Sequence, residues 1–229
     1  MSPQIYVRNY DLPTVNIKEA LRYMGGKEEE STLSLLRECI EECLPLLSYK
    51  VCYGYSDIKV NEEEVEFSFG TFRSKLLAKN LKDSREAVIF GATIGLEMDR
   101  LISKYGRLAP AKGVCFQGLG SERIEALCDA FNNDIREEEM KKGRSLRPRF
   151  SPGYGDLALN HQREIFAFLD CKRKIGLSLN ESMLMSPSKS VTAIIGISDC
   201  GQLPDSKGDQ VDKCRKCSKV DCVFREIKE

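Results

Sequence analysis

The feature that most constrains the fold is a long amphipathic segment in the second half of the chain, from about Ala109 to Met140. Its apolar side chains recur at helical spacing and form one stripe: Ile124, Leu127, Cys128, Phe131 and Ile135. Gly143 and the basic run KKGRSLRPR follow, which is typical of a helix C-terminus, where the helix dipole favours positive charge. The segment therefore predicts one long helix whose apolar stripe faces a core.

Shorter elements alternate irregularly around this helix. Asn16 fits an N-cap and Gly25-Gly26 a stop for a helix between them. Helices are expected over 17–24, 31–47, 74–81 and 159–169, and strands over 49–60, 64–69, 175–179 and 190–198, while 86–102 is expected to be a strand, a bend and a helix. This order does not resemble a doubly wound parallel sheet. It predicts an α+β domain over 1–198, with a mainly antiparallel twisted sheet flanked by helices, followed by a small cysteine-rich metal-binding tail over 199–229.

Charge and hydropathy exclude several classes of function. The 229 residues carry 35 basic and 35 acidic side chains, so a general nucleic-acid binder, which needs a basic excess, is not expected. The N-terminal sequence has no apolar run that could serve as a signal peptide. No stretch approaches the roughly 20 apolar residues that span a bilayer. The chain is therefore expected to be cytoplasmic and to have no membrane partner.

The ten cysteines need an explanation other than disulfides, because reducing compartments keep thiols reduced. Six are scattered in apolar or helical contexts, and Cys39 and Cys43 are interpreted as small core residues. The other four are close together near the C-terminus: Cys200, Cys214, Cys217 and Cys222. Four thiolates complete a tetrahedral zinc site or an iron–sulfur cluster, and spacing alone does not separate the two. A redox-active Cys214–Cys217 pair and four free thiols are the remaining alternatives.

The segment Arg149–Asp156, RFSPGYGD, has the composition of a ligand-binding loop. Pro152 fixes one backbone angle, while Gly153 and Gly155 permit conformations closed to other residues. Such a loop can bring backbone amides and carbonyls against a small ligand. Arg149 offers a planar fork of donors suited to a carboxylate. The alternative is a tight turn between two helices with Arg149 in a surface ion pair, because Gly and Pro mostly mark turns.

Three ordered motifs resemble the S-adenosylmethionine-binding activation domain of cobalamin-dependent methionine synthase. The first is the arginine followed two residues later by Pro-Gly-Tyr, here Arg149 and Pro152 to Tyr154. The second is the downstream segment LNESMLMSPSKSV, and the third is the upstream helix ERIEALCDAFNNDI, in which Glu125 falls at the position of a ligand-contacting glutamate. The resemblance covers roughly 118–197, and the N-terminal third is similar only through helix order and the LRYMGGK segment.

This resemblance implies roles for individual residues. Arg149 would hold the methionyl carboxylate, and backbone groups of Ser151 and Gly153 would contact the ligand. Tyr154 would sit between the ligand and the cobalt face of a docked corrinoid, and Glu125 would bind the polar or sulfonium-adjacent part of the ligand. The family's second glutamate, six residues before the arginine, is replaced by Gly143. A shifted contact would come from one of the upstream glutamates, Glu137, Glu138 or Glu139. The paired tyrosines after the Ser-Val strand are absent.

The resemblance also implies a function, which is reductive reactivation of a corrinoid protein by methyl transfer from S-adenosylmethionine. The chain would then be a methyltransferase-type component that acts with a corrinoid-binding methyltransferase, such as methionine synthase, and with a reductant such as flavodoxin or ferredoxin. The partner would supply the corrinoid, because the chain has no Asp-x-His-x-x-Gly motif. The one-electron reduction step favours an iron–sulfur cluster in the tail. The alternatives are a non-catalytic docking or electron-relay factor for a corrinoid protein, and a metalloprotein that shares only the fold.

Overall fold

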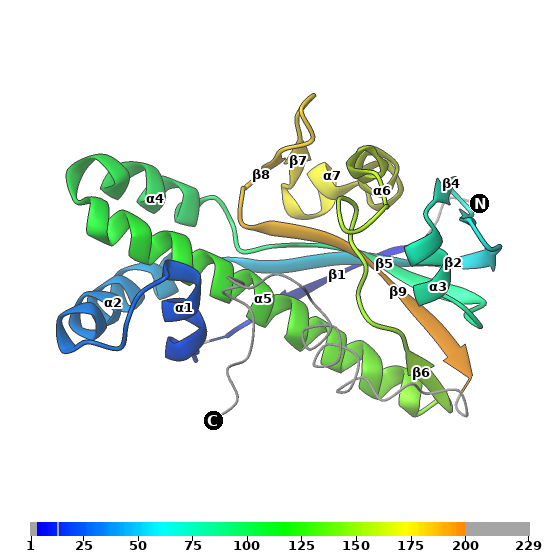
Figure 1. Ribbon diagram of the computed structural model, residues 1–229, viewed down its shortest axis with the longest axis horizontal. Helices are drawn as coiled ribbons and strands as arrows, with labels where there is room; N and C mark the ends of the chain where they lie inside the picture. Colours follow the sequence, from blue (N-terminus) through cyan, green and yellow to red (C-terminus); the bar gives the residue numbers. More distant parts are fainter. Residues whose placement is uncertain (1–3, 13, 200–229) are drawn as a thin grey trace.

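The computed structural model describes residues 4–12 and 14–199 (Figure 1). The helices are α1 (Ile17–Met24), α2 (Glu30–Cys43), α3 (Lys75–Asn80), α4 (Glu97–Leu108), α5 (Pro110–Met140), α6 (Gln162–Leu169) and α7 (Cys171–Ile175), with short 3-10 turns η1 (Leu44–Leu46) and η2 (Leu159–His161). The strands are β1 (Ile5–Tyr10), β2 (Tyr49–Val60), β3 (Glu64–Phe67), β4 (Gly70–Arg73), β5 (Glu86–Thr93), β6 (Arg144–Leu146), β7 (Ser178–Leu179), β8 (Met185–Ser186) and β9 (Ser190–Asp199). None of the helices in the described ranges is long and apolar enough to cross a membrane.

The main sheet is antiparallel, with strand order β4-β3-β2-β5-β9-β6 and with β1 paired to the first half of β2. The strands β2, β5 and β9 run side by side through its centre, and every residue of β5 after Glu86 is buried. A separate hairpin of β7 and β8 projects from one face (Figure 1). The central strands of the sheet are therefore covered by other elements on both faces.

Each face of the sheet has its own apolar core. Successive side chains of a strand point to opposite faces, so Val88 and Phe90 of β5 pack with α1, α2, α4 and α5, whereas Ala87 and Ile89 pack with α3, α6 and α7. The long helix α5 crosses below the sheet in Figure 1, and α6 and α7 lie above it. The observed architecture is the α+β fold with a mainly antiparallel sheet flanked by helices that the sequence predicts.

Several predicted elements are confirmed almost to the residue. The helix α1 begins after Asn16, whose side chain accepts a hydrogen bond from Glu19 N at 3.2 Å, and it ends at Gly25 in a left-handed conformation. The apolar stripe predicted for the long helix is buried along its whole length in α5. The six cysteines outside the tail are buried core residues, namely Cys39, Cys43, Cys52, Cys115, Cys128 and Cys171.

Other predictions need correction. The second helix ends at Cys43 and not near Leu47, because Pro45 lies in a following 3-10 turn and cannot continue the helical hydrogen bonds. The strand expected over 175–179 is shorter, since Ile175 ends α7. The strands β1, β4, β6 and β8 and the helix α7 are absent from the sequence predictions. The cysteine-rich tail lies outside the described residues except for Asp199, so the domain boundary at 198/199 stays a prediction.

Candidate functional site

The segment between β6 and η2 contains the RFSPGYGD loop and is fixed at its start to the edge of β9. Arg147 N donates to Gly196 O at 2.8 Å, and Phe150 exchanges two hydrogen bonds with Ile194, both at 2.9 Å. The Phe150 side chain is buried on the face covered by α6. Because neighbouring side chains of an extended segment point to opposite faces, Arg149 is directed towards α5.

On α5, Arg149 meets two carboxylates. Its Nη2 lies 3.3 Å from Glu125 Oε2 and 2.9 Å from Asp129 Oδ1. Glu125 and Asp129 are four residues apart, so they stand one above the other on the same helical face. The Arg149 side chain is 27% exposed, compared with 45% for Glu125 and 67% for Asp129. The structure thus brings together the predicted residues Arg149 and Glu125, in an ion pair that opens to solvent.

Asp129 is a member of this cluster that the sequence interpretation missed. Its spacing of one helical turn from Glu125 was the available signal, but many charged pairs on a solvated helix share that spacing. Beneath the cluster lies Cys128, and burial raises the pKa of its thiol to about 12, although Arg149 opposes this shift. The Cys128 thiol is therefore a neutral part of the core under the charged cluster.

A tyrosine of α1 borders the same cluster. Burial raises the pKa of Tyr23 above its usual value, and the negative charge of Glu125 adds to this effect. Tyr23 belongs to the LRYMGGK segment, so α1 and α5 both contribute to the surroundings of the Arg149 pair. The N-terminal part of the chain, which resembled the family only loosely, therefore helps to build this region.

The loop that follows Arg149 is closed by its own backbone. Gly153 N donates to Leu157 O at 2.8 Å, and Tyr154 N donates to Ser151 O at 3.1 Å. Gly153 and Gly155 have φ values of +88° and +59°, which residues with a Cβ rarely adopt. The Tyr154 ring is 59% exposed and meets the Phe150 ring edge-on, with the centroids 5.3 Å apart. Tyr154 is thus held at the surface against the Phe150 ring, five residues after Arg149.

The downstream motif LNESMLMSPSKSV forms the β7–β8 hairpin and the entry to β9. Glu181 lies in the turn of the hairpin, where its carbonyl accepts from Arg163 at 3.3 Å. Lys189 Nζ donates to Gln117 O and Ser121 Oγ on α5, both at 3.0 Å. Burial lowers the pKa of Lys189. Ser121 lies one turn before Glu125, so this motif is joined to α5 next to the Arg149 cluster.

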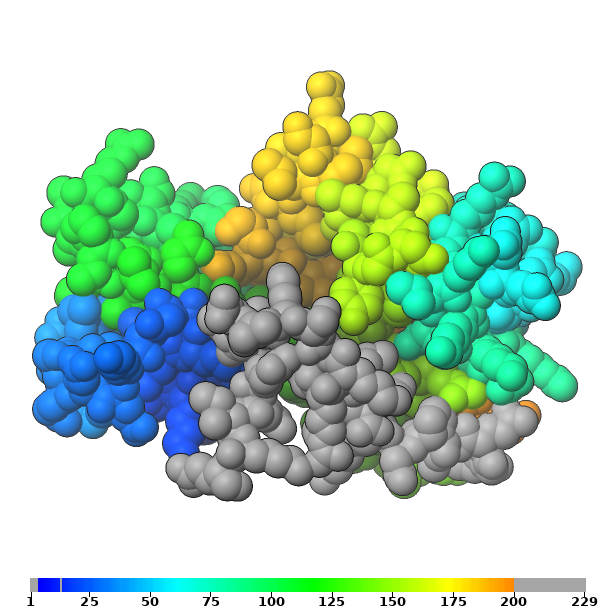
Figure 2. All heavy atoms as spheres, viewed as in Figure 1, coloured from blue at the N-terminus to red at the C-terminus, as the bar shows by residue number. Residues whose placement is uncertain are grey.

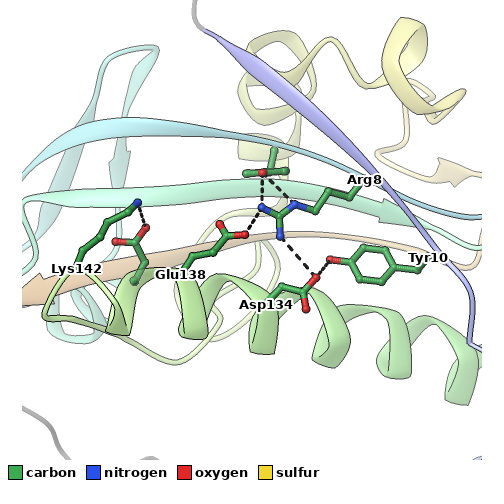
Figure 3. Close-up of polar contacts among 7 residues, drawn as sticks. Arg8, Tyr10, Asp134, Glu138 and Lys142 are labelled. Carbon is green, nitrogen blue, oxygen red and sulfur yellow. Dashed lines mark hydrogen bonds and ion pairs between the residues drawn. The ribbon is translucent and has the colours of Figure 1, made fainter.

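The three upstream glutamates do not all remain candidates for a shifted ligand contact. Glu138 bonds Arg8 of β1 at 2.7 Å (Figure 3). Glu139 is fully buried and pairs with Arg144 of β6 and with Lys142. Glu138 thus holds β1 and Glu139 holds β6 through an ion pair with an arginine of that strand. The structure does not favour either of them as the replacement for the family's second ligand-contacting glutamate.

The predicted metal ligands Cys200, Cys214, Cys217 and Cys222 lie outside the described residues. Among residues 4–12 and 14–199 no group of three or more His, Cys, Asp or Glu side chains is arranged to hold a metal ion. The metal site thus stays a prediction from the spacing of the cysteines.

Comparison with known proteins identifies the family. The family model for the activation domain of vitamin B12-dependent methionine synthase matches residues 87–214, which is more than half of the chain. A solved structure described as the MetH reactivation domain bound to AdoHcy is similar to this chain with a TM-score of 0.65 and 13% identity, over 88% of this chain and 81% of that one. At this identity the likeness shows the fold. No curated protein matches the chain. With its matching sequence region and its α+β fold, the chain belongs to the family of vitamin B12-dependent methionine synthase activation domains.

Proposed function

We propose that this protein binds S-adenosylmethionine at the Arg149 cluster and presents its methyl group to a corrinoid carried by a partner methyltransferase. The observation that supports this most is the grouping of Arg149, Glu125 and Asp129 directly before the Pro-Gly-Tyr loop. Membership of the family and a similar fold in a protein solved with AdoHcy agree with the proposal.

The charges of the cluster complement those of the ligand. The methionyl part of S-adenosylmethionine carries a carboxylate, an ammonium group and a sulfonium group, whose net charge is positive. The cluster offers one guanidinium and two carboxylates, whose net charge is negative. The planar fork of Arg149 suits the ligand carboxylate, and Glu125 and Asp129 suit the ammonium and sulfonium groups. On binding, the ion pairs of Arg149 with Glu125 and Asp129 would be replaced by ion pairs between these side chains and the ligand.

The loop would supply backbone contacts and a lid. Ser151 O and Gly153 N are already bonded within the loop, so the ligand contacts are assigned to Ser151 N and Gly153 O. Tyr154, whose ring is exposed, would cover the ligand on the side from which a corrinoid approaches. Lys189 and Ser121 extend the polar surface of α5 by one turn beyond Glu125. They are candidates to contact the adenosyl part, for which the paired tyrosines of the family are missing.

The reaction then needs positioning and not acid–base catalysis. One electron from a reductant such as flavodoxin or ferredoxin converts the partner's cob(II)alamin to cob(I)alamin. The nucleophilic electron pair of cob(I)alamin would form the bond to the methyl carbon of S-adenosylmethionine. The sulfur–methyl bond would break, and the electron pair of that bond would remain on the sulfur of S-adenosylhomocysteine. The residues of this chain hold the methyl group in line with the acceptor and exclude water.

The cysteine tail would supply a metal site to the same function. We assign Cys200, Cys214, Cys217 and Cys222 to one site, with an iron–sulfur cluster favoured over zinc because the reaction consumes an electron. Metal analysis of anaerobically purified protein tests this assignment. Two or four equivalents of iron and sulfide per chain support an iron–sulfur cluster. One equivalent of zinc would show a zinc site instead, and the absence of both metals would overturn the assignment.

The functional test combines the protein with a cob(II)alamin-loaded candidate methyltransferase, a reductant and S-adenosylmethionine. The spectrum of methylcobalamin should appear only when all components are present. Calorimetry on the isolated protein separates the main alternative, since a non-catalytic docking factor has no need to bind S-adenosylmethionine. A wild-type protein that shows no binding at millimolar ligand would exclude the proposed function.

A further inference from the structure

Asp156, the last residue of the RFSPGYGD segment, makes a set of contacts that belongs to none of the roles above. Its carboxylate accepts hydrogen bonds from Ser74 Oγ, from Lys75 N at 2.8 Å and from Leu76 N at 3.3 Å. These donors form the N-terminus of α3, which lies 80 to 82 positions earlier in the chain. One side chain therefore joins the end of the loop to a distant helix.

The contact completes the hydrogen bonding of the first turn of α3. The first amides of a helix have no carbonyl partner within the helix. Ser74 is the N-cap, and its Oγ accepts from Leu77 N at 2.9 Å. Asp156 takes the two amides before it, Lys75 N and Leu76 N. These contacts keep the pKa of the Asp156 carboxyl below its usual value, with the Ser74 hydroxyl as the largest cause.

The residue before Asp156 is a glycine, which allows the loop to come close to α3. Gly155 has φ of +59°, and a Cβ at this position would lie 2.5 Å from Leu76 Cδ1. On the other side of the loop, a Cβ on Gly153 would lie 3.1 Å from Leu159 Cδ1. The two glycines therefore let the loop fit between α3 and the start of η2. The loop segment and α3 lie side by side on the surface shown in Figure 2.

The loop is thus attached at both ends to different parts of the fold. Its start is bonded to β9 through Phe150 and Ile194, and its end is bonded to α3 through Asp156. Tyr154 lies between these two attachments and is 59% exposed. A side chain that is so exposed has little packing of its own to hold it. Its position therefore depends on the Phe150 ring, on the hydrogen bonds within the loop and on the two attachments of the loop.

We infer that Asp156 is a positioning residue, which holds Tyr154 and the loop backbone in the conformation used for methyl transfer by bonding the N-terminus of α3. This inference rests on the proposed function for its consequence, but the restraint itself does not depend on any ligand. Arg149 holds the ligand through its charge, so loss of the restraint should affect the transfer step more than binding.

The first experiment measures the restraint without ligand. The chain has no tryptophan, so the Tyr154→Trp variant carries one fluorophore in the loop. Time-resolved anisotropy should show a restrained indole in this variant. Adding Asp156→Ala should increase the amplitude of nanosecond motion, and Asp156→Asn, which keeps one acceptor for the helix amides, should give an intermediate value. Glu97→Ala at the first turn of α4, at the other end of the sheet, should leave the anisotropy unchanged (Figure 1).

The second experiment measures the consequence in the protein with Tyr154 intact. In Asp156→Ala the rate of methyl transfer at saturating S-adenosylmethionine should fall about 10- to 100-fold, while the dissociation constant changes less than about threefold. Asp156→Asn should recover part of the rate. A merely structural role would instead lower the melting temperature, and the transfer rate and the number of binding sites per chain would fall together with the folded fraction.

The outcomes separate the two proposals. An unchanged anisotropy in Asp156→Ala overturns the restraint, whatever the ligand does. A mobile indole with an unchanged transfer rate overturns the positioning role. If the wild-type protein binds no S-adenosylmethionine, the proposed function fails, and the anisotropy alone then decides whether Asp156 restrains the loop.

Discussion

Two arginines contact α5 in the same way, yet they belong to different kinds of environment. Arg8 of β1 is paired with Asp134 at 3.6 Å and Glu138 at 2.7 Å, and Arg149 is paired with Glu125 and Asp129. In both cases the two carboxylates are four residues apart on α5. The local pattern of one guanidinium over an i,i+4 pair of carboxylates is therefore shared.

The surroundings of the two arginines differ. Arg8 also donates to the Tyr53 hydroxyl, at 3.1 Å from Nε and 2.7 Å from Nη2, and its guanidinium lies 4.9 Å from the centroid of the Tyr53 ring. Tyr10 donates to Asp134 at 2.7 Å and closes the network (Figure 3). Burial opposes the charge of Arg8, but Glu138 and Tyr53 raise its pKa above the usual value. Arg149 is followed by one bridged residue, Phe150, and then by a glycine-rich loop, whereas Arg8 lies within the paired strand β1. Under the proposed function, the neighbouring element, and not the ion pair, distinguishes Arg149 from Arg8.

The largest expected effect is that of Arg149→Ala on ligand binding. Loss of a charge-assisted pair with the ligand carboxylate should weaken S-adenosylmethionine binding by about 2–3 kcal/mol, which is roughly 30- to 150-fold. The melting temperature should change little, because the Arg149 pair is partly exposed. Calorimetry and thermal unfolding measure the two quantities. Binding that is equally tight in the variant would show that the cluster is only a surface ion pair.

The matched change in the other region, Arg8→Ala, should have the opposite pattern. It removes the hydrogen bonds to Tyr53 and Glu138, so Glu138 loses its arginine, while Asp134 keeps only the hydrogen bond from Tyr10. Unfolding in urea should show a loss of about 1–2 kcal/mol in stability. The folded fraction should bind S-adenosylmethionine with the wild-type affinity. A large loss of affinity with unchanged stability would place a ligand site at Arg8 and break the comparison.

A smaller effect is expected from the carboxylates that face Arg149. Asp129→Asn and Glu125→Gln each keep the shape of the side chain but remove one negative charge opposite the cationic groups of the ligand. Each should weaken S-adenosylmethionine binding by roughly three- to tenfold. The matched control is Asp134→Asn in the Arg8 network, which should leave the affinity unchanged. If Asp129→Asn has no effect and Glu125→Gln does, the ligand contact belongs to Glu125 alone.

The smallest effect concerns alkaline stability in the Arg8 network. Burial raises the pKa of Tyr10 above its ordinary value of 10.0, and the hydrogen bond to Asp134 adds to the shift. A phenol with a raised pKa in the folded state stabilises the protein fully below the unfolded value near 10, and this stabilisation is lost as pH rises further. The decrease in melting temperature between about pH 9 and pH 11 should therefore be smaller in Tyr10→Phe than in wild type. A decrease in Tyr10→Phe that is as large as in wild type would contradict the assignment.

Local signals explain what the sequence could predict. The Asn16 cap, the Gly25 stop and the apolar stripe of α5 depend on residues within a few turns of one another, and the elements that they predict are confirmed. The strands β1 and β6 are different, because each is short and carries an arginine that pairs with a carboxylate far along the chain, Arg8 with Glu138 and Arg144 with Glu86. The three residues RSL of β6 carry no strand signal of their own, whereas IYVRNY of β1 has β-branched and aromatic residues, a signal that was missed.

The residues of the candidate site also differ in whether local sequence signals could predict them. Arg149, Glu125 and the loop could be predicted because they occur in ordered motifs with recognisable residue types. Asp129, Lys189 and Asp156 could not, since their importance depends on which helix faces them after folding. The sheet brings Lys189 and Arg149 to the same face of α5 from segments that have no local relationship in the sequence.

The attachment of the loop to β9 and α3 also determines when the site can exist during folding. Phe150 needs Ile194 and Asp156 needs Ser74, so the loop closes contacts across long stretches of chain in both directions. Contacts of this range form late, because the intervening chain must first lose its freedom. During synthesis, Arg149 and Glu125 leave the ribosome well before β9 does. A nascent chain therefore carries every charged group of the cluster before it has the strand that holds the loop. The proposed ligand site is complete only when β9 is in place.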